Sequence, residues 1–82
     1  MPDALEHPVV RRLACTCVVA DETLLWDWLV EHLDRARFRV AATGMVRDGY
    51  SRRAEVEFTN ELDSHRFERW ARSRGFELEE LP

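Results

Sequence analysis

The sequence FRVAATGMVRDGYSRRAEVEF, residues 38–58, decides the fold, because apolar and polar side chains alternate on both sides of a turn signal. Successive side chains of a β-strand point to opposite faces, so sustained alternation is typical of a half-buried strand. Residues 38–46 and 50–58 both alternate in this way, and the segment Arg47-Asp48-Gly49 between them favours a tight turn. The stretch therefore predicts a β-hairpin.

The loop length sets which residues pair across this hairpin. A two-residue Asp-Gly turn would place Ala41 opposite Val56 and mix apolar with charged side chains on each face. A three-residue loop with Gly49 in the left-handed conformation pairs Val46 with Tyr50 instead. We expect this second register, because it sets apolar side chains opposite one another on one face. Its pairs are Phe38–Phe58, Arg39–Glu57, Val40–Val56, Ala42–Ala54 and Thr43–Arg53.

The segments before the hairpin predict a strand and a helix. Residues 9–19 form the first strand, with an inward set of Leu13, Cys15, Cys17 and Val19. Asp21 is a favourable N-cap for a helix that extends to about Ala36. Its expected core stripe is Leu25, Leu29, Leu33 and Ala36. The neighbouring Leu24, Trp26, Trp28 and Val30 widen the apolar arc, which favours either deep burial or cover by another chain.

A second helix and a final strand are expected after the hairpin. Thr59 or Asn60 caps the helix, and Gly75 ends it with Phe76 placed for a hydrophobic contact. The expected inward positions of this helix are Leu62, Phe67, Trp70 and Ala71. Residues 76–81 alternate weakly and predict a short strand.

The resulting order, β-α-β-β-α-β, predicts a fold. With short connections and right-handed crossovers it gives the ferredoxin-like α+β arrangement, a two-layer sandwich whose antiparallel sheet carries both helices on one face. We expect a single ferredoxin-like domain over residues 9–82, preceded by a flexible N-terminal lead over residues 1–8. The other face of the sheet, called the open face below, is then left without helices.

The composition limits the classes of function that we expect for this chain. The chain has 82 residues and 45% hydrophobic content, enough for one two-layer core. Its net charge is −4 although it has 12 basic residues, all of them arginine, and this balance argues against general nucleic-acid binding. No apolar run is long enough to cross a bilayer and no signal peptide is apparent, so a soluble, cytoplasmic protein is expected.

The residues that usually carry catalysis form no recognisable site. Cys15 and Cys17 occupy alternate positions of one strand, without a second pair or a nearby histidine to complete a metal site, and are expected to be small core residues. The three histidines are scattered, and the three glycines form no phosphate-binding loop. We expect no enzyme, no cofactor and no metal; a metal-handling protein that uses Cys15 is the least favoured alternative.

The open face is the most informative surface, because the register gives it small, half-apolar side chains with charged ones around them. An apolar centre with a charged rim is typical of a protein interface. The expected interface residues, one of them on the first helix, are Arg12, Thr16, Trp26, Arg39, Ala41, Thr43, Met45, Arg53, Glu55 and Glu57.

The leading hypothesis is a non-enzymatic protein-binding or regulatory module, and a homodimer, with an unidentified protein partner. Small acidic α+β proteins of this kind include phage-encoded inhibitors such as anti-CRISPRs, whose carboxylates compete for a nucleic-acid-binding groove. The acidic residues Glu77, Glu79 and Glu80 near the end of the chain favour this finer hypothesis.

The alternative is RNA binding. The stretch Ala54-Glu55-Val56-Glu57-Phe58, followed by the second helix, resembles the third strand of the RNA recognition motif, and the resemblance implies the same topology. The two base-stacking aromatics of that family fall at Arg53 and Glu55 here, and the aromatic of the first strand is also missing. RNA binding by this chain would therefore depend on Arg12, Arg39 and Arg53 rather than on stacking.

Overall fold

The computed structural model describes residue 5 and residues 7–82, and most of the lead expected over residues 1–8 lies outside these described residues. The chain forms β1 (Arg11–Val18), α1 (Glu22–His32), β2 (Phe38–Met45), β3 (Ser51–Phe58), α2 (Glu61–Ser73) and β4 (Glu77–Leu81). Short 3₁₀ turns at Val19–Asp21 and Arg35–Arg37 flank α1. The predicted α+β class and order of elements are confirmed.

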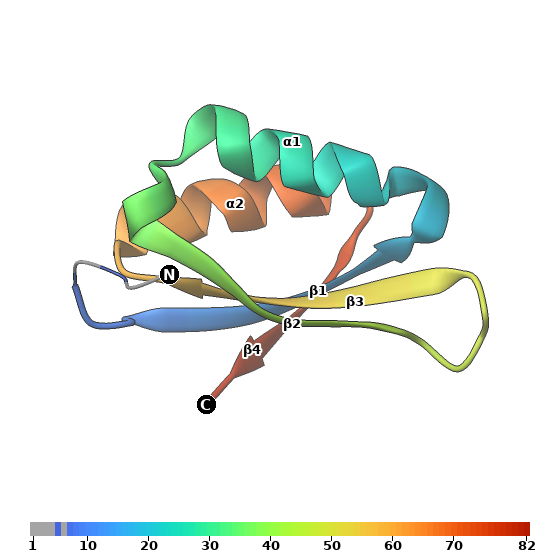
Figure 1. The fold of residues 1–82 in the computed structure, drawn as a ribbon. Helices are drawn as coiled ribbons and strands as arrows, with labels where there is room; N and C mark the ends of the chain where they lie inside the picture. Colours follow the sequence, from blue (N-terminus) through green and yellow to red (C-terminus); the bar gives the residue numbers. More distant parts are fainter. Residues whose placement is uncertain (1–4, 6) are drawn as a thin grey trace.

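The four strands form one sheet in the order β2-β3-β1-β4, with every neighbouring pair antiparallel. Both helices cover the same face of this sheet, and the other face carries no helix (Figure 1). No helix among the described residues is long and apolar enough to span a membrane.

The core fills the space between the sheet and the helices. Alternate residues of β1 and β3 point into it, and α1 and α2 supply its other wall. Its members are Leu13, Cys15, Cys17, Leu25, Leu29, Leu33, Ala54, Val56, Phe58, Phe67, Ala71 and Phe76. Phe58 and Phe67 are fully buried and their ring centroids lie 5.5 Å apart, which joins β3 to α2.

α1 begins after Asp21, the predicted N-cap position, although the Asp21 side chain accepts no capping hydrogen bond, and only the end of the helix differs from the prediction. The helix stops at His32 rather than Ala36, because Leu33 is extended (φ −122°) and the Asp34 carboxylate accepts a hydrogen bond from the Ala36 N–H to begin a separate 3₁₀ turn. The first strand is one residue shorter than predicted at this end: β1 ends at Val18, so Val19 lies in a 3₁₀ turn and is exposed rather than inward. The predicted stripe Leu25, Leu29 and Leu33 is buried as expected.

The inward face of α2 is rotated from the predicted one. Leu62 was expected in the core but is 68% exposed, whereas Asp63 and Ser64 are buried. The Asn60 side chain caps the helix by accepting from the Asp63 N–H, and the inward row then continues through Phe67 and Ala71 at helical spacing. Leu62 lies one position, or about 100°, from this row.

The end of α2 agrees with the prediction. Gly75 has a positive φ of 80°, and the Phe76 N–H donates to the Ala71 carbonyl at 3.0 Å, as in a Schellman ending. The Phe76 ring is buried and meets the Trp70 ring edge-on with centroids 5.5 Å apart.

The hairpin register is correct at one end and wrong at the other. The predicted pairs Phe38–Phe58, Arg39–Glu57 and Val40–Val56 are present. A β-bulge at Ala41 then shifts the register, so that Ala42 lies opposite Glu55 and Thr43 opposite Ala54. The expected pairs Ala42–Ala54 and Thr43–Arg53 are therefore absent.

The turn of the hairpin is one residue longer than predicted. Val46 pairs with Ser51 through a 2.8 Å backbone hydrogen bond, so the loop has four residues, 47–50, instead of three. The Asp48 carboxylate accepts from the backbone N–H groups of Tyr50 and Ser51 and from the Ser51 hydroxyl, which stabilises the longer loop. Gly49 has the expected positive φ, 83°.

Candidate functional site

The open face of the sheet is built from alternate residues of four strands. On β1 and β3, Arg12, Thr16, Arg53, Glu55 and Glu57 lie on this face as predicted, because each is paired with a neighbour of the same face. Arg39 joins them from β2, opposite Glu57. From β4 the face receives Glu77, Glu79 and Leu81, which lie opposite Thr16, Ala14 and Arg12.

The bulge moves two expected interface residues off this face. Thr43 and Met45 lie opposite Ala54 and Arg52, and residues directly opposite one another share a face. Because Ala54 is buried under the helices, Thr43 and Met45 lie on the helix side of the edge strand β2, where both are exposed. Ala41 is exposed at the bulge itself.

Two small residues replace them on the open face. Ala42 and Gly44 lie opposite Glu55 and Arg53. A shallow hollow of about 460 Å³ lies here, lined by residues 42–47 together with Arg53 and Glu55. A Cβ atom added to Gly44 would meet nothing within 4 Å, so the space above this strand is open.

Ion pairs occupy the end of the open face that lies away from the hairpin loop. Glu57 is only 7% exposed, and its carboxylate accepts from Arg39 Nε at 2.9 Å and lies 3.1 Å from Arg12 Nε. Arg12 also donates to the Pro82 carbonyl at 3.0 Å. A buried carboxylate between two guanidinium groups is satisfied within the chain and is not free for a ligand.

A second ion-pair bridge crosses the middle of the face. Arg53 on β3 pairs with Glu55 of its own strand and with Glu79 of β4, 3.3 Å away. This bridge spans β1, where Ala14 lies opposite both glutamates and is 2% exposed. The expected apolar centre with a charged rim is therefore wrong: charged pairs cover the centre, and the small residues lie beside β2.

Trp26 lies on α1, away from the open face. Both Trp26 and Trp28 are half-buried and pack against the core, which accounts for part of the wide apolar arc of this helix. Trp28 stacks on Trp70 of α2 with centroids 5.3 Å apart and on His32 at 4.7 Å. Leu24 and Val30 remain exposed on the outside.

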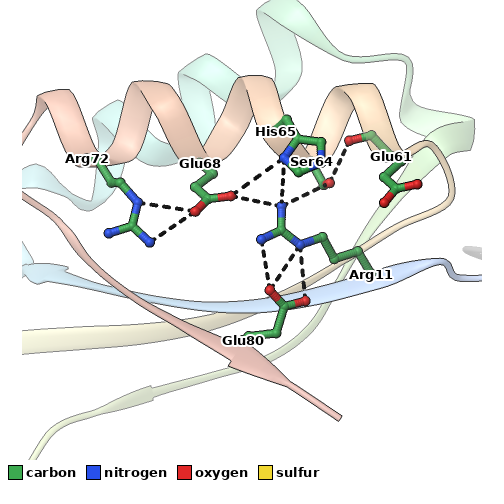
Figure 2. A network of polar contacts seen from close by, with 7 residues as sticks. All are labelled: Arg11, Glu61, Ser64, His65, Glu68, Arg72 and Glu80. Atoms are coloured by element: carbon green, nitrogen blue, oxygen red, sulfur yellow. Dashed lines mark hydrogen bonds and ion pairs between the residues drawn. The ribbon is translucent and has the colours of Figure 1, made fainter.

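The most extensive polar network of the described residues lies along α2 (Figure 2). Arg11 donates to both carboxylate oxygens of Glu80 on β4, and its Nη1 lies 2.9 Å from Glu68 on α2. The same nitrogen is 3.3 Å from Ser64 Oγ and from His65 Nδ1, and Glu68 continues to Arg72. The network ties a central strand, an edge strand and a helix together.

The charges of this network are held strongly in their ionised forms. Hydrogen bonds from Arg72 and Arg11 lower the pKa of Glu68, and the hydrogen bond from Arg11 lowers that of Glu80. Arg11, in turn, has a raised pKa, chiefly because of Glu80. Lowered carboxylate pKa values beside a raised guanidinium pKa mean that these ion pairs favour the ionised form of each partner in the folded chain.

The cysteines are core residues, as expected from their positions. Cys15 and Cys17 are both buried and unbonded, and burial raises the pKa of Cys15 to about 12. A thiol in this state is a poor nucleophile and a poor metal ligand. Over residues 5 and 7–82, no group of three or more potential ligands gathers in a way that could hold a metal ion.

Comparison with known protein families, with curated proteins and with solved structures finds no match to this chain.

Three features of the surface escape sequence reasoning. Ala42 and Gly44 lie on the opposite face of the sheet from the predicted one, because a β-bulge at Ala41 shifts the register and no turn residue in the sequence indicates that bulge. Glu79 was noted only as part of an acidic tail, although the alternation of β4 is a signal that places it beside Ala14. The outward position of Leu62 follows from the Asn60 cap. Identifying Asn60 rather than Thr59 as the cap residue could have predicted this position from the sequence.

Proposed function

We propose that this chain is a non-enzymatic protein-binding module that docks a partner protein on its open sheet face. The observation that carries the proposal is the hollow above Ala42 and Gly44, walled by Arg53 and Glu55. Small residues beside a charged pair leave room for one side chain of a partner, and they supply both donors and acceptors for its backbone.

The hollow continues into exposed apolar surface at the hairpin end of the sheet. Val18 is 48% exposed and lies opposite Ser51, which pairs with Val46 on its other side. These three residues therefore share the open face, next to Gly44. A contact here would bury apolar surface while leaving the ion pairs around Glu57 intact, which is favourable because breaking a buried pair costs several kcal/mol.

We also propose that the fold is ferredoxin-like. The β-α-β-β-α-β order, the central position of β1 and β3 and the placement of both helices on one face support this assignment. Cytoplasmic localisation is part of the same proposal.

A finer form of the proposal concerns the partner. Glu77 and Glu79 lie on the open face, and a partner with a basic, nucleic-acid-binding groove would be attracted to them. The acidic edge therefore supports the proposal that the chain inhibits such a complex, in the manner of an anti-CRISPR. RNA binding by Arg12, Arg39 and Arg53 is less favoured, because each of these arginines is already paired with a glutamate.

The test is affinity capture from the native host with the wild-type chain, Gly44→Arg and Ala20→Arg. Gly44→Arg fills the hollow, and Ala20→Arg adds the same charge at an exposed position of the Val19–Asp21 turn. We expect one protein to be captured by wild type and Ala20→Arg but not by Gly44→Arg, and to bind the purified chain in calorimetry. Equal capture by all three chains would overturn the proposal.

A second measurement separates the RNA alternative. Fluorescence anisotropy with a labelled single-stranded RNA should show no saturable binding at about 150 mM salt. Binding that is lost in Arg53→Glu and weakened by salt would replace the protein-binding proposal with an RNA-binding one.

A further inference from the structure

The outer surface of the helix layer has opposite charges on its two helices. The exposed stripe of α1 carries Asp27 and Glu31. The exposed stripe of α2 carries Arg66 and Arg69. Among the described residues, Asp27, Glu31 and Arg69 take part in no ion pair, and Arg66 has only a 3.9 Å contact with Asp63.

A groove lies along the exposed stripe of α2. It has a volume of about 520 Å³, and its lining combines the apolar Trp28, Leu62 and Trp70 with Arg66 and Arg69 and with His65 and Ser73. Leu62, Arg66 and Arg69 follow one another at i, i+4 and i+7 and therefore share one face of α2. The groove thus offers apolar surface beside two positive charges.

The exposed face of α1 is a ridge whose charge and polarity complement those of the groove. Asp27, Val30 and Glu31 stand at i, i+3 and i+4 and share one face of α1. Val30 is 52% exposed, and the exposed Leu24 lies about one turn before Asp27 on the same helix. The ridge therefore has exposed apolar side chains flanked by negative charges, complementary to the groove in both polarity and charge.

We infer that the helix layer binds the helix layer of a second copy of this chain, with α1 of each copy seated in the groove along α2 of the other. A two-fold axis parallel to the helices and between them places α1 over α2 of the partner and makes both contacts at once. A two-fold axis across the helices would instead place like charges together. The charge pattern thus selects both the partner and its orientation.

The size of the surface predicts a weak dimer. With 11 and 13 residues, α1 and α2 are about 16 and 20 Å long. Two helices of this length side by side bury on the order of 1,000 Å² when both partners are counted, at the low end for specific interfaces. We expect a dissociation constant on the order of 10–100 μM.

The inference goes beyond the proposed docking function, because it uses the helix layer, on the face opposite the hollow. A monomer in solution would overturn the dimer and leave the Gly44→Arg capture test unaffected. Conversely, equal capture by the wild-type chain and Gly44→Arg would overturn the docking proposal and leave the dimer test unaffected.

The experiment is sedimentation equilibrium of the full chain from about 5 μM to 1 mM, with charge-reversal variants. Arg69→Glu and Glu31→Arg should each weaken the dimer by at least about tenfold, because the two-fold axis repeats each repulsion. Arg47→Glu makes the same charge change in the hairpin loop, away from the helix layer, and should leave the constant unchanged.

Mixing gives the decisive result. An equimolar mixture of Arg69→Glu and Glu31→Arg chains restores both attractive pairs and should form a heterodimer about as tight as the wild type, as should the double variant with itself. Salt should weaken the wild-type dimer. A wild-type monomer at 1 mM, or a dimer that neither variant weakens, would overturn the inference. Weakening without recovery in the mixture would also overturn it.

Discussion

The guanidinium of Arg11 and the carboxylate of Glu80 meet across neighbouring strands, with Nη2 and Oε1 2.8 Å apart. Arg11 is 14% exposed, and the same side chain reaches Ser64 and Glu68 on α2 (Figure 2). The edge strand β4 is only five residues long. This arginine therefore supplies a connection between β4 and the helix layer that backbone pairing with β1 alone does not provide.

Replacing Arg11 by methionine should lower the free energy of unfolding by about 1–3 kcal/mol, because methionine keeps the apolar stem but removes the less exposed of the two cations of Glu68 and the donor to Ser64. Arg72→Met removes the other cation of Glu68, but Arg72 is 63% exposed, so its loss should cost less than about 0.5 kcal/mol. Urea denaturation followed by Trp fluorescence gives both values. Equal costs for the two variants would show that Arg11 does not hold the network.

The same network makes stability depend on acid pH. Glu68 and Glu80 have pKa values lowered from 4.5 by Arg72 and Arg11, and His65 is the other titratable group that faces them. A carboxylate with a lowered folded pKa stabilises the protein above its unfolded pKa, and this contribution is lost as the pH falls through the folded value.

The free energy of unfolding should therefore fall as the pH is lowered from about 5 towards 2, and it should fall less steeply in Arg11→Met than in wild type. Chemical denaturation at a series of pH values measures both slopes. Parallel curves for the two proteins would show that the Arg11 network is not the source of the acid sensitivity.

How far the sequence predicts this fold can be judged at β2. Alternation correctly predicts its position and its pairing at Phe38, Arg39 and Val40, because each face has a distinct polarity there. From Ala41 onward the residues are small or exposed on both sides, so no burial difference opposes a one-residue shift. The bulge arises in this stretch, and it places Thr43 and Met45 on the opposite face from the predicted one.

The helices show the same limit. Leu25, Leu29, Phe67 and Ala71 were predicted correctly because a fully apolar stripe has one possible orientation. Near the start of α2, however, hydrophobicity alone would place Leu62 in the core rather than Asp63 and Ser64. The position of the N-cap decides which side of the helix faces the core there. A buried Ser64 that donates to the Glu61 carbonyl satisfies its own hydroxyl, which hydropathy does not reveal.

The two glycines Gly44 and Gly75 should respond oppositely to substitution. Gly44 is a strand residue with open space at its Cβ position, so Gly44→Thr should raise the free energy of unfolding by about 0.5–1 kcal/mol through better strand propensity. Gly75 has a φ of 80° at the end of α2, so Gly75→Ala should lower it by about 1–2 kcal/mol. Thermal and urea unfolding measure both. A destabilised Gly44→Thr would contradict the open space above β2.

The thiols of Cys15 and Cys17 should be unreactive in the folded protein. Both side chains are buried in the core, and burial raises the pKa of Cys15 to about 12 and also raises that of Cys17. At about pH 8 the folded chain should therefore react with a chromogenic disulfide reagent at the rate at which it unfolds, whereas in urea both thiols react at once. The unfolded chain is its own control for reagent and stoichiometry. Rapid reaction of one equivalent in the folded state would show that the end of β1 opens locally, and it would make Cys17, which lies next to the exposed Val18, the residue to replace first.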